Sequence, residues 1–209
     1  MKYIYLHGFA SGPKSGKATF FRSRLATAGI ELHIPDLAEE SFENLTISGQ
    51  LRVIEREAAS EHQAVLIGSS LGGYLAAIYA SLHPDSVAKV ILLAPAFWFA
   101  HRWPEKLGAQ AVADWEQTGF REFFHYGFLR TMKVRWDLMA DGRLHPGAPD
   151  FHQRALIFHG TSDDVVPAAF SQEFASGRPN VTLRLLPSDH QLSDQVELIW
   201  SESRAFLGV

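Results

Sequence analysis

The chain has 209 residues, of which 46% are apolar and 20% charged, the size and composition of one globular domain. Its formal net charge of -4 leaves no basic surplus for a phosphate backbone, which argues against a nucleic-acid partner and favours a small-molecule substrate. The chain contains no cysteine, which excludes disulfides, thiolate catalysis and a thiolate zinc site.

The hydropathy pattern indicates neither a secretory leader nor a membrane span. The first apolar stretch, Tyr3–Leu6, ends at His7 and is too short for the apolar region of a signal peptide. No apolar run approaches the roughly 18 residues that a membrane-spanning helix needs. We therefore expect a cytoplasmic protein.

Short apolar segments rich in β-branched residues alternate along the chain with longer segments of helical periodicity. Strands are predicted at Tyr3–Leu6, Glu31–Ile34, Ala64–Ile67, Val90–Leu93, Ala155–Phe158 and Thr182–Leu186. Helices are predicted at Lys14–Ala28, Leu45–Ser60, Leu71–Leu82, Ala168–Ser176 and Asp194–Phe206. This order predicts a compact α/β fold in which about six mainly parallel strands are flanked by helices.

The segment between the third strand and the third helix contains two adjacent serines in the sequence GSSLG. A catalytic serine must be exposed on a sharp turn, where the residues two before and two after it approach each other and must be small. Ser70 has Gly68 and Gly72 at these positions, whereas Ser69 would have two bulky aliphatic residues. The spacing therefore predicts Ser70 as a nucleophile.

Residues 96–152 interrupt the alternation, because a connection in such folds usually has only about 2 to 6 residues. This insertion contains four of the five tryptophans, Trp98, Trp103, Trp115 and Trp136, together with many phenylalanines. We expect a lid of short helices with an apolar underside, within a single domain that spans residues 1–209. The alternative is a helical subdomain with a small core of its own.

A serine nucleophile needs a histidine base and an acid that orients it. In such folds both follow the serine in the chain, first the acid and then the base, each in a loop at the carboxyl end of a later strand. His190 is the only histidine after His159, and it lies between the last predicted strand and the last predicted helix. We predict it as the base. The turn after the preceding strand offers Asp163 and Asp164 as the acid that orients the imidazole.

Two segments resemble known families. The sequence HGTSDDVVP is similar to the H-G-x-x-D-x-x-V-P segment of α/β-hydrolase esterases and lipases. That resemblance implies Asp163 as the acid, Asp164 as a turn or capping residue, and His159 as a structural residue that supports the turn. The sequence YLHGFASGPKSGKA resembles the opening of small bacterial esterases of the YqiA type. In the wider family, the residue after H-G and the residue after the nucleophile supply N–H groups to the oxyanion hole, which implies Phe9 and Leu71 here.

These features predict a compact α/β-hydrolase that cleaves carboxylic esters or acyl thioesters through an acyl-enzyme on Ser70, with no cofactor and no metal. The aromatic insertion favours a substrate with an apolar acyl or aryl group. Its basic residues, including Arg102 and Lys106, could bind an anionic carrier headgroup or form a solvated lid surface. The alternatives are another reaction of the same triad, such as C–C bond hydrolysis, amide hydrolysis or perhydrolysis, and a non-catalytic ligand-binding protein.

Overall fold

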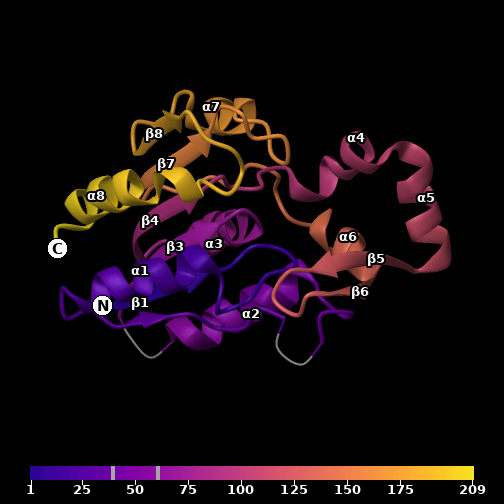
Figure 1. Cartoon of the computed structure of the whole chain (residues 1–209), viewed down its shortest axis with the longest axis horizontal. Coiled ribbons are helices and arrows are strands. Elements are labelled where there is room, and N and C mark those ends of the chain that lie inside the picture. Colours follow the sequence, from indigo (N-terminus) through magenta and orange to yellow (C-terminus); the bar gives the residue numbers. More distant parts are fainter. Residues whose placement is uncertain (39–40, 60–61) are drawn as a thin grey trace.

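A computed structural model describes residues 1–38, 41–59 and 62–209, and its centre is a parallel sheet (Figure 1). The strand order is β2-β1-β3-β4-β7-β8, and every neighbouring pair is parallel. The strands are β1 (Lys2–Leu6), β2 (Leu32–His33), β3 (Ala64–Ser69), β4 (Val87–Leu93), β7 (Arg154–Gly160) and β8 (Val181–Leu186). Each predicted strand has its counterpart here, so the predicted α/β class is confirmed.

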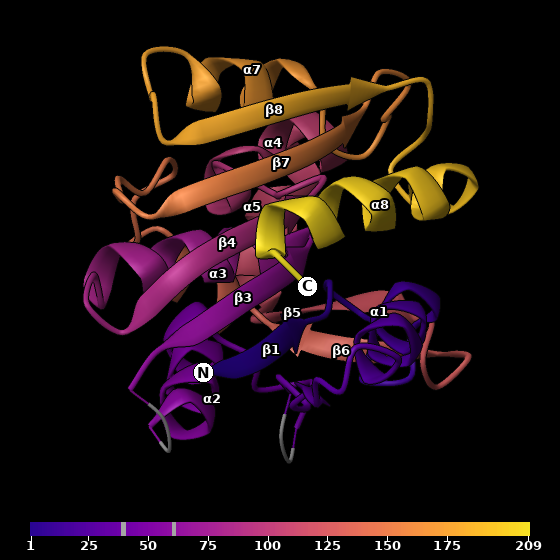
Figure 2. The ribbon, with the colours of Figure 1, turned by 90° about the vertical axis from the view of Figure 1, so that its left-hand side faces the viewer.

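Helices cover both faces of this sheet (Figure 2). One face carries α1 (Gly16–Ala26) and α8 (Val196–Leu207), and the other carries α2 (Ile47–Ala58), α3 (Leu71–Leu82) and α7 (Ala169–Ala175). A 3₁₀ turn, η2 (Ser193–Gln195), precedes α8. Each predicted helix is present; the predicted end of the second one, Ser60, lies outside the described residues.

The central strands β3 and β4 are apolar over most of their length, as expected for strands that are covered on both faces. In β3, Ile67 packs in one apolar layer with Phe21 of α1. The intervening Leu66 packs in the other layer with Leu75 of α3. Since all six strands run in the same direction, their carboxyl ends meet at one edge of the sheet, and the loops that leave this edge can converge on a single site.

The insertion lies beside the sheet (Figure 1) and contains strands as well as helices. Its elements are η1 (Phe99–His101), α4 (Trp103–Leu107), α5 (Ala109–Thr118), β5 (Phe120–His125), β6 (Arg130–Arg135) and α6 (Asp137–Gly142). The strands β5 and β6 form an antiparallel hairpin. The expectation of short helices alone was therefore wrong for this part, because residues 120–125 alternate in burial like a half-covered strand.

An aromatic cluster holds the insertion together and joins it to the rest of the core. Trp115 is buried, and its ring centroid lies 5.7 Å from that of Trp103 and 5.2 Å from that of Phe123. Its indole N–H donates to the Val134 carbonyl at 3.1 Å. These residues belong to the same buried cluster as the side chains of α3. The underside of the insertion is therefore continuous with the main core.

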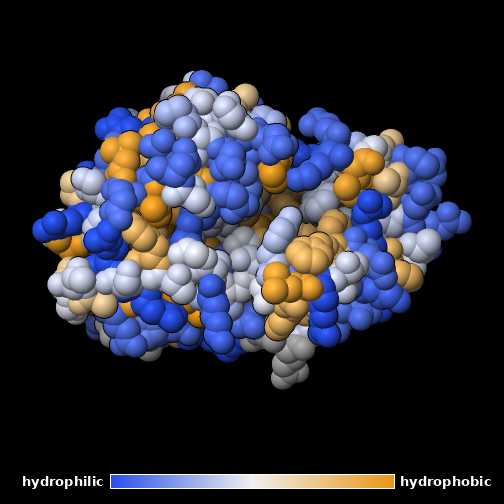
Figure 3. Space-filling view, viewed as in Figure 1, coloured by the Kyte–Doolittle hydropathy of each residue, from blue (hydrophilic) through white to orange (hydrophobic). Residues whose placement is uncertain are grey.

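The turn of the hairpin presents apolar side chains to solvent, and an apolar patch is visible at this turn (Figure 3). Phe124, Tyr126, Phe128 and Leu129 are all exposed there. The main-chain N–H of Tyr126 donates to the Ala10 carbonyl at 2.8 Å, which attaches the hairpin to the loop after β1.

No helix in the described ranges has the length and hydrophobicity that crossing a bilayer requires.

Candidate active site

Ser70 occupies a strained turn between β3 and α3, with φ at 53° and ψ at -116°. A residue other than glycine rarely adopts a positive φ, and strain of about 1 to 3 kcal/mol of this kind is concentrated at functional sites. Two glycines make the turn possible. A Cβ atom on Gly68 would lie 2.3 Å from the Gly72 carbonyl oxygen, and one on Gly72 would lie 2.1 Å from the Leu6 carbonyl oxygen. Ser70 is partly exposed, whereas Ser69 is buried.

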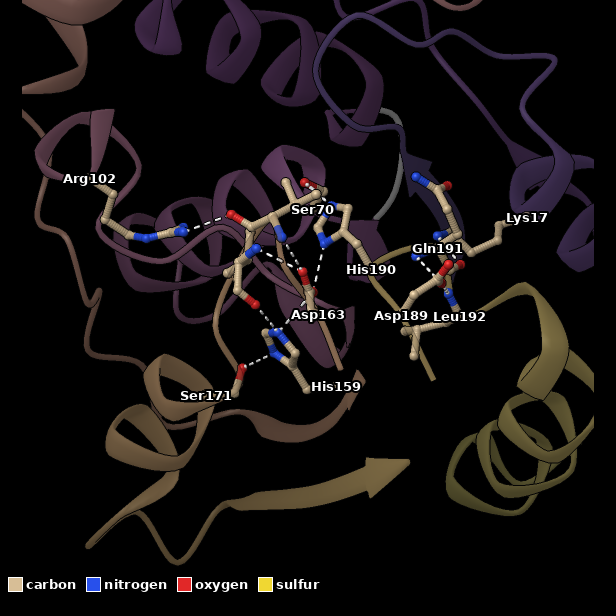
Figure 4. Close-up of polar contacts among 12 residues, drawn as sticks. Lys17, Ser70, Arg102, His159, Asp163, Ser171, Asp189, His190, Gln191 and Leu192 are labelled. Carbon is tan, nitrogen blue, oxygen red and sulfur yellow. Dashed lines mark hydrogen bonds and ion pairs between the residues drawn. The ribbon is translucent and has the colours of Figure 1, made fainter. Parts of the chain in front are cut away.

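Three side chains from separate loops meet at this turn (Figure 4). His190 Nε2 lies 3.0 Å from Ser70 Oγ, and His190 Nδ1 lies 2.7 Å from Asp163 Oδ2. Because an ionised carboxylate can only accept, the proton of the neutral imidazole must be on Nδ1. Nε2 then presents its lone pair to the Ser70 hydroxyl, which is the arrangement that lets a histidine take the proton of a serine.

Asp163 is buried, and its other carboxylate oxygen, Oδ1, also accepts hydrogen bonds. Oδ1 accepts the main-chain N–H groups of Val165 at 2.9 Å and Val166 at 2.7 Å. Burial by itself would raise the pKa of Asp163, but hydrogen bonds from His159 and His190 outweigh it and hold the pKa well below its ordinary value. The carboxylate is therefore ionised at neutral pH.

His159 supports the same carboxylate from the buried side. Its Nε2 lies 2.7 Å from the Val166 carbonyl oxygen and 3.1 Å from Asp163 Oδ2, and its Nδ1 lies 2.7 Å from Ser171 Oγ. A carbonyl oxygen can only accept, so Nε2 carries a proton and donates it to that side. Asp164, the other candidate acid, is exposed, and the structure brings Asp163 rather than Asp164 to His190.

A cavity of about 90 Å³ opens beside Ser70. Its lining includes the two residues predicted for the oxyanion hole, apolar aromatic side chains and two basic side chains: Phe9, Leu71, Phe99, Trp103, Arg102 and Lys106. Among the hydrogen bonds of turns, loops and helix ends in the described part of the chain, none is donated by the Phe9 or Leu71 N–H to a backbone carbonyl. Phe9 and Leu71 remain the predicted donors to an oxygen in the cavity.

The insertion covers the Phe9 side of this cavity. The Phe9 ring packs edge-on against Phe123 of β5, with centroids 5.1 Å apart, and against Trp103 of α4 at 6.1 Å. This cavity is thus bounded partly by the loop after β1 and partly by the insertion.

Lys17, for which the sequence predicts no role, contacts the loop that carries His190. Its ammonium group donates to the Gln191 carbonyl at 2.6 Å. Burial lowers the pKa of Lys17 to about 8, although Asp189 and Asp163 act in the opposite direction. The sequence signal for Lys17 is its place in SGKA, at the end of the opening segment, where α1 begins.

The parallel sheet and the order of Ser70, Asp163 and His190 along the chain, each in a loop at the carboxyl end of a strand, define an α/β-hydrolase. The predicted kinship with that class is confirmed. Within it, the chain belongs to the uncharacterised protein family UPF0227, whose model matches residues 2–206.

Solved structures with the same fold cover almost the whole chain. A supposed hydrolase from Agrobacterium vitis S4 is 25% identical, with a TM-score of 0.84 over 98% of this chain and 87% of that one. Est1E from Butyrivibrio proteoclasticus is 19% identical, with a TM-score of 0.79 over 98% of this chain and 86% of that one. Mouse alpha/beta hydrolase domain-containing protein 10 is 20% identical, with a TM-score of 0.76 over 98% of this chain and 89% of that one. No curated protein matches the chain significantly.

Proposed function

We propose that the protein is a serine hydrolase that cleaves carboxylic esters or acyl thioesters through an acyl-enzyme on Ser70. One observation carries the proposal: His190 lies between Ser70 and Asp163, at 3.0 Å from the hydroxyl and 2.7 Å from the carboxylate. The strained backbone of Ser70 and the buried, ionised Asp163 add to it, because a structural serine needs neither.

In the proposed reaction, Ser70 Oγ attacks the acyl carbon while His190 Nε2 takes the hydroxyl proton. The carbonyl oxygen becomes negative and accepts hydrogen bonds from the main-chain N–H groups of Phe9 and Leu71. Asp163 stabilises the imidazolium. His190 then gives the proton to the leaving group, which is the oxygen of an alcohol or the sulfur of a thiol. As the bond from the acyl carbon to this atom breaks, the carbonyl re-forms and leaves an acyl-serine. Water, activated by His190 in the same way, releases the acid and restores Ser70.

The cavity supports an apolar acyl or aryl group in the substrate. Phe99, Trp103 and Val166 line it, and apolar walls with a few polar groups are what most small-ligand pockets have. Two structural neighbours fit the same interpretation. Est1E has been solved with ferulic acid, an aromatic acid, bound, at 19% identity and a TM-score of 0.76. A monoacylglycerol lipase from Paleococcus ferrophilus is 16% identical, with a TM-score of 0.71.

The insertion, residues 96–152, serves in this proposal as a lid over the site within one domain. Its hairpin is attached to the loop after β1 through the Tyr126 N–H, and Phe123 packs on Phe9 next to the nucleophile. In this proposal, substrate enters between the insertion and the loops of the sheet.

The substrate class is tested with p-nitrophenyl esters and acyl thioesters of graded chain length, using the wild-type protein and Ser70→Ala. We expect hydrolysis of at least one series, and loss of its kcat by about 10⁴-fold or more in the variant, as in other serine hydrolases. Equal turnover by the wild type and the variant would contradict the proposed function.

A further inference from the structure

Two cations face the proposed substrate cavity. Arg102 precedes α4 and Lys106 lies within it, one helical turn further on, so that both side chains lie on the same face. Both line the cavity that contains Ser70. Among the residues that the structure describes, neither of the two forms an ion pair with a carboxylate. Positive charge therefore collects beside the nucleophile without a protein counter-ion in contact.

The Arg102 guanidinium is held in place and keeps unused hydrogen-bonding capacity. Its Nη2 donates to the Val165 carbonyl at 2.8 Å, in the loop that also carries Asp163 (Figure 4). The guanidinium carbon lies 4.6 Å from the centre of the Phe170 ring, a cation–π contact. Its Nε is buried and has no hydrogen-bond partner in the described chain. A buried N–H without an acceptor is costly, and such groups are rare in native proteins unless they have a role.

The electrostatic environment points the same way. Burial lowers the pKa of Arg102, against a weaker opposite effect of Glu105 and Asp163. Partial loss of solvent around its ammonium group also lowers the pKa of Lys106, and the neighbouring Arg102 lowers it further, against a weaker opposite effect of Asp164 and Asp163. Both shifts mean that each positive charge is less stable here than in water. An anion between the two side chains would remove that cost.

We propose that Arg102 and Lys106 bind an anionic group, a carboxylate or a phosphate, that the substrate itself carries. This inference rests on the proposed function and narrows its substrate class. Arg102 and Lys106 line the same cavity as Ser70, Phe99 and Trp103. The anionic group therefore lies on the part of the substrate next to the scissile carbonyl, beside the apolar part that contacts Phe99 and Trp103.

The test uses two matched pairs of esters, because the anionic group could belong to the acyl part or to the leaving group. The first pair is the p-nitrophenyl monoester of adipic acid and its methyl-capped neutral form. The second pair is 4-carboxyphenyl butyrate and its methyl-capped neutral form. For each pair the readout is the ratio of kcat/KM for the anionic ester to kcat/KM for the neutral ester, so that effects common to both members cancel.

In one of the two pairs we expect the ratio to fall about threefold in Lys106→Gln, whose side chain is exposed, and about tenfold in Arg102→Gln, whose charge is more buried. Lys106→Glu should lower it further, since it places a like charge against the anion. The ratio of the wild-type protein should also fall with rising salt. The matched control is Lys133→Gln, which removes an exposed charge on β6 outside the cavity and should leave the ratio unchanged.

Arg102→Gln also breaks the contact with Val165 and could move the loop of Asp163, and for this reason the two Lys106 variants decide the result. If neutral esters are hydrolysed and the ratio of kcat/KM for anionic to neutral ester is the same in the wild-type protein and both Lys106 variants, for both pairs, the inference is overturned and the proposed function stands. A wild-type protein that hydrolyses none of the four esters would overturn both.

Discussion

His190 Nε2 lies 3.0 Å from Ser70 Oγ, although the two residues are 120 positions apart in the chain. Ser70 follows β3 and His190 follows β8, and two strands, β4 and β7, separate β3 from β8 in the sheet. The contact exists because parallel strands end at a common edge, from which the long loop after β8 returns toward β3. The parallel topology therefore determines which side chains can cooperate.

Substitution of each aspartate should show whether Asp163 or Asp164 is the acid. We expect Asp163→Asn to reduce kcat by about 10⁴-fold, because an amide can no longer stabilise the imidazolium or fix the Nδ1–H tautomer of His190. Asp164→Asn is the matched control, since this side chain is exposed, and its kcat should stay within about twofold of the wild type. Steady-state kinetics on one activated ester measure both. Comparable losses in the two variants would refute the assignment of the acid.

Asp163 should also make stability depend on pH. Burial raises its pKa, but the hydrogen bonds from His159 and His190 outweigh burial, so the pKa in the folded chain lies below the unfolded value of about 3.9. Such a group stabilises the fold fully above the unfolded pKa, and this stabilisation is lost as the pH falls toward the folded pKa. We expect the free energy of unfolding to fall less steeply below about pH 5 in Asp163→Asn than in the wild type. Urea denaturation across this range measures it, and identical slopes would contradict the shift.

The elbow should not tolerate a single added methyl group. In Gly72→Ala the new Cβ would lie 2.1 Å from the Leu6 carbonyl oxygen, and the backbone of both residues is buried and cannot easily move. We expect a loss of about 3 kcal/mol or more in the free energy of unfolding. The control is Gly16→Ala at the start of α1, where the space around the Cβ is open, and where the change should be within about 0.5 kcal/mol or stabilising. A Gly72→Ala protein as stable as the control would show that the turn is looser than described.

Lys17 should act through the position of the His190 loop. Lys17→Met removes the hydrogen bond to the Gln191 carbonyl, and we expect kcat to fall by about three- to tenfold as His190 loses part of its orientation. Lys17→Arg should recover part of the loss, because it keeps a charged donor. The matched control is Lys14→Met, an exposed change in the same segment. An unchanged kcat in Lys17→Met would exclude a positioning role.

The parallel sheet could be predicted from the sequence because its signals are local. Each strand is a short apolar run bounded by turn residues, and the helix after Ser70 begins and ends as predicted, at Leu71 and Leu82. The pair of glycines around Ser70 could also be interpreted locally, since the spacing follows from the geometry of one sharp turn. Chain order then restricted the base to His190, the last histidine of the chain.

Other parts of the site depend on contacts between distant segments, which no local pattern encodes. The hairpin of residues 120–135 was missed because aromatic residues at short intervals suit a helix as well as a strand. The bond from Lys17 to Gln191 joins residues 174 positions apart. The placement of Arg102 and Lys106 at the cavity depends on how the insertion packs on the core. The sequence alone left these two residues equally compatible with a solvated surface.

The most direct measurement is the intact mass of the protein after exposure to a fluorophosphonate, with the modified peptide then identified by sequencing. If His190 activates Ser70, the wild-type protein will gain one phosphonyl group on Ser70, Ser70→Ala will gain none, and His190→Ala will react far more slowly. A wild-type protein that remains unmodified, or that is modified on another residue while Ser70 stays free, would contradict the account.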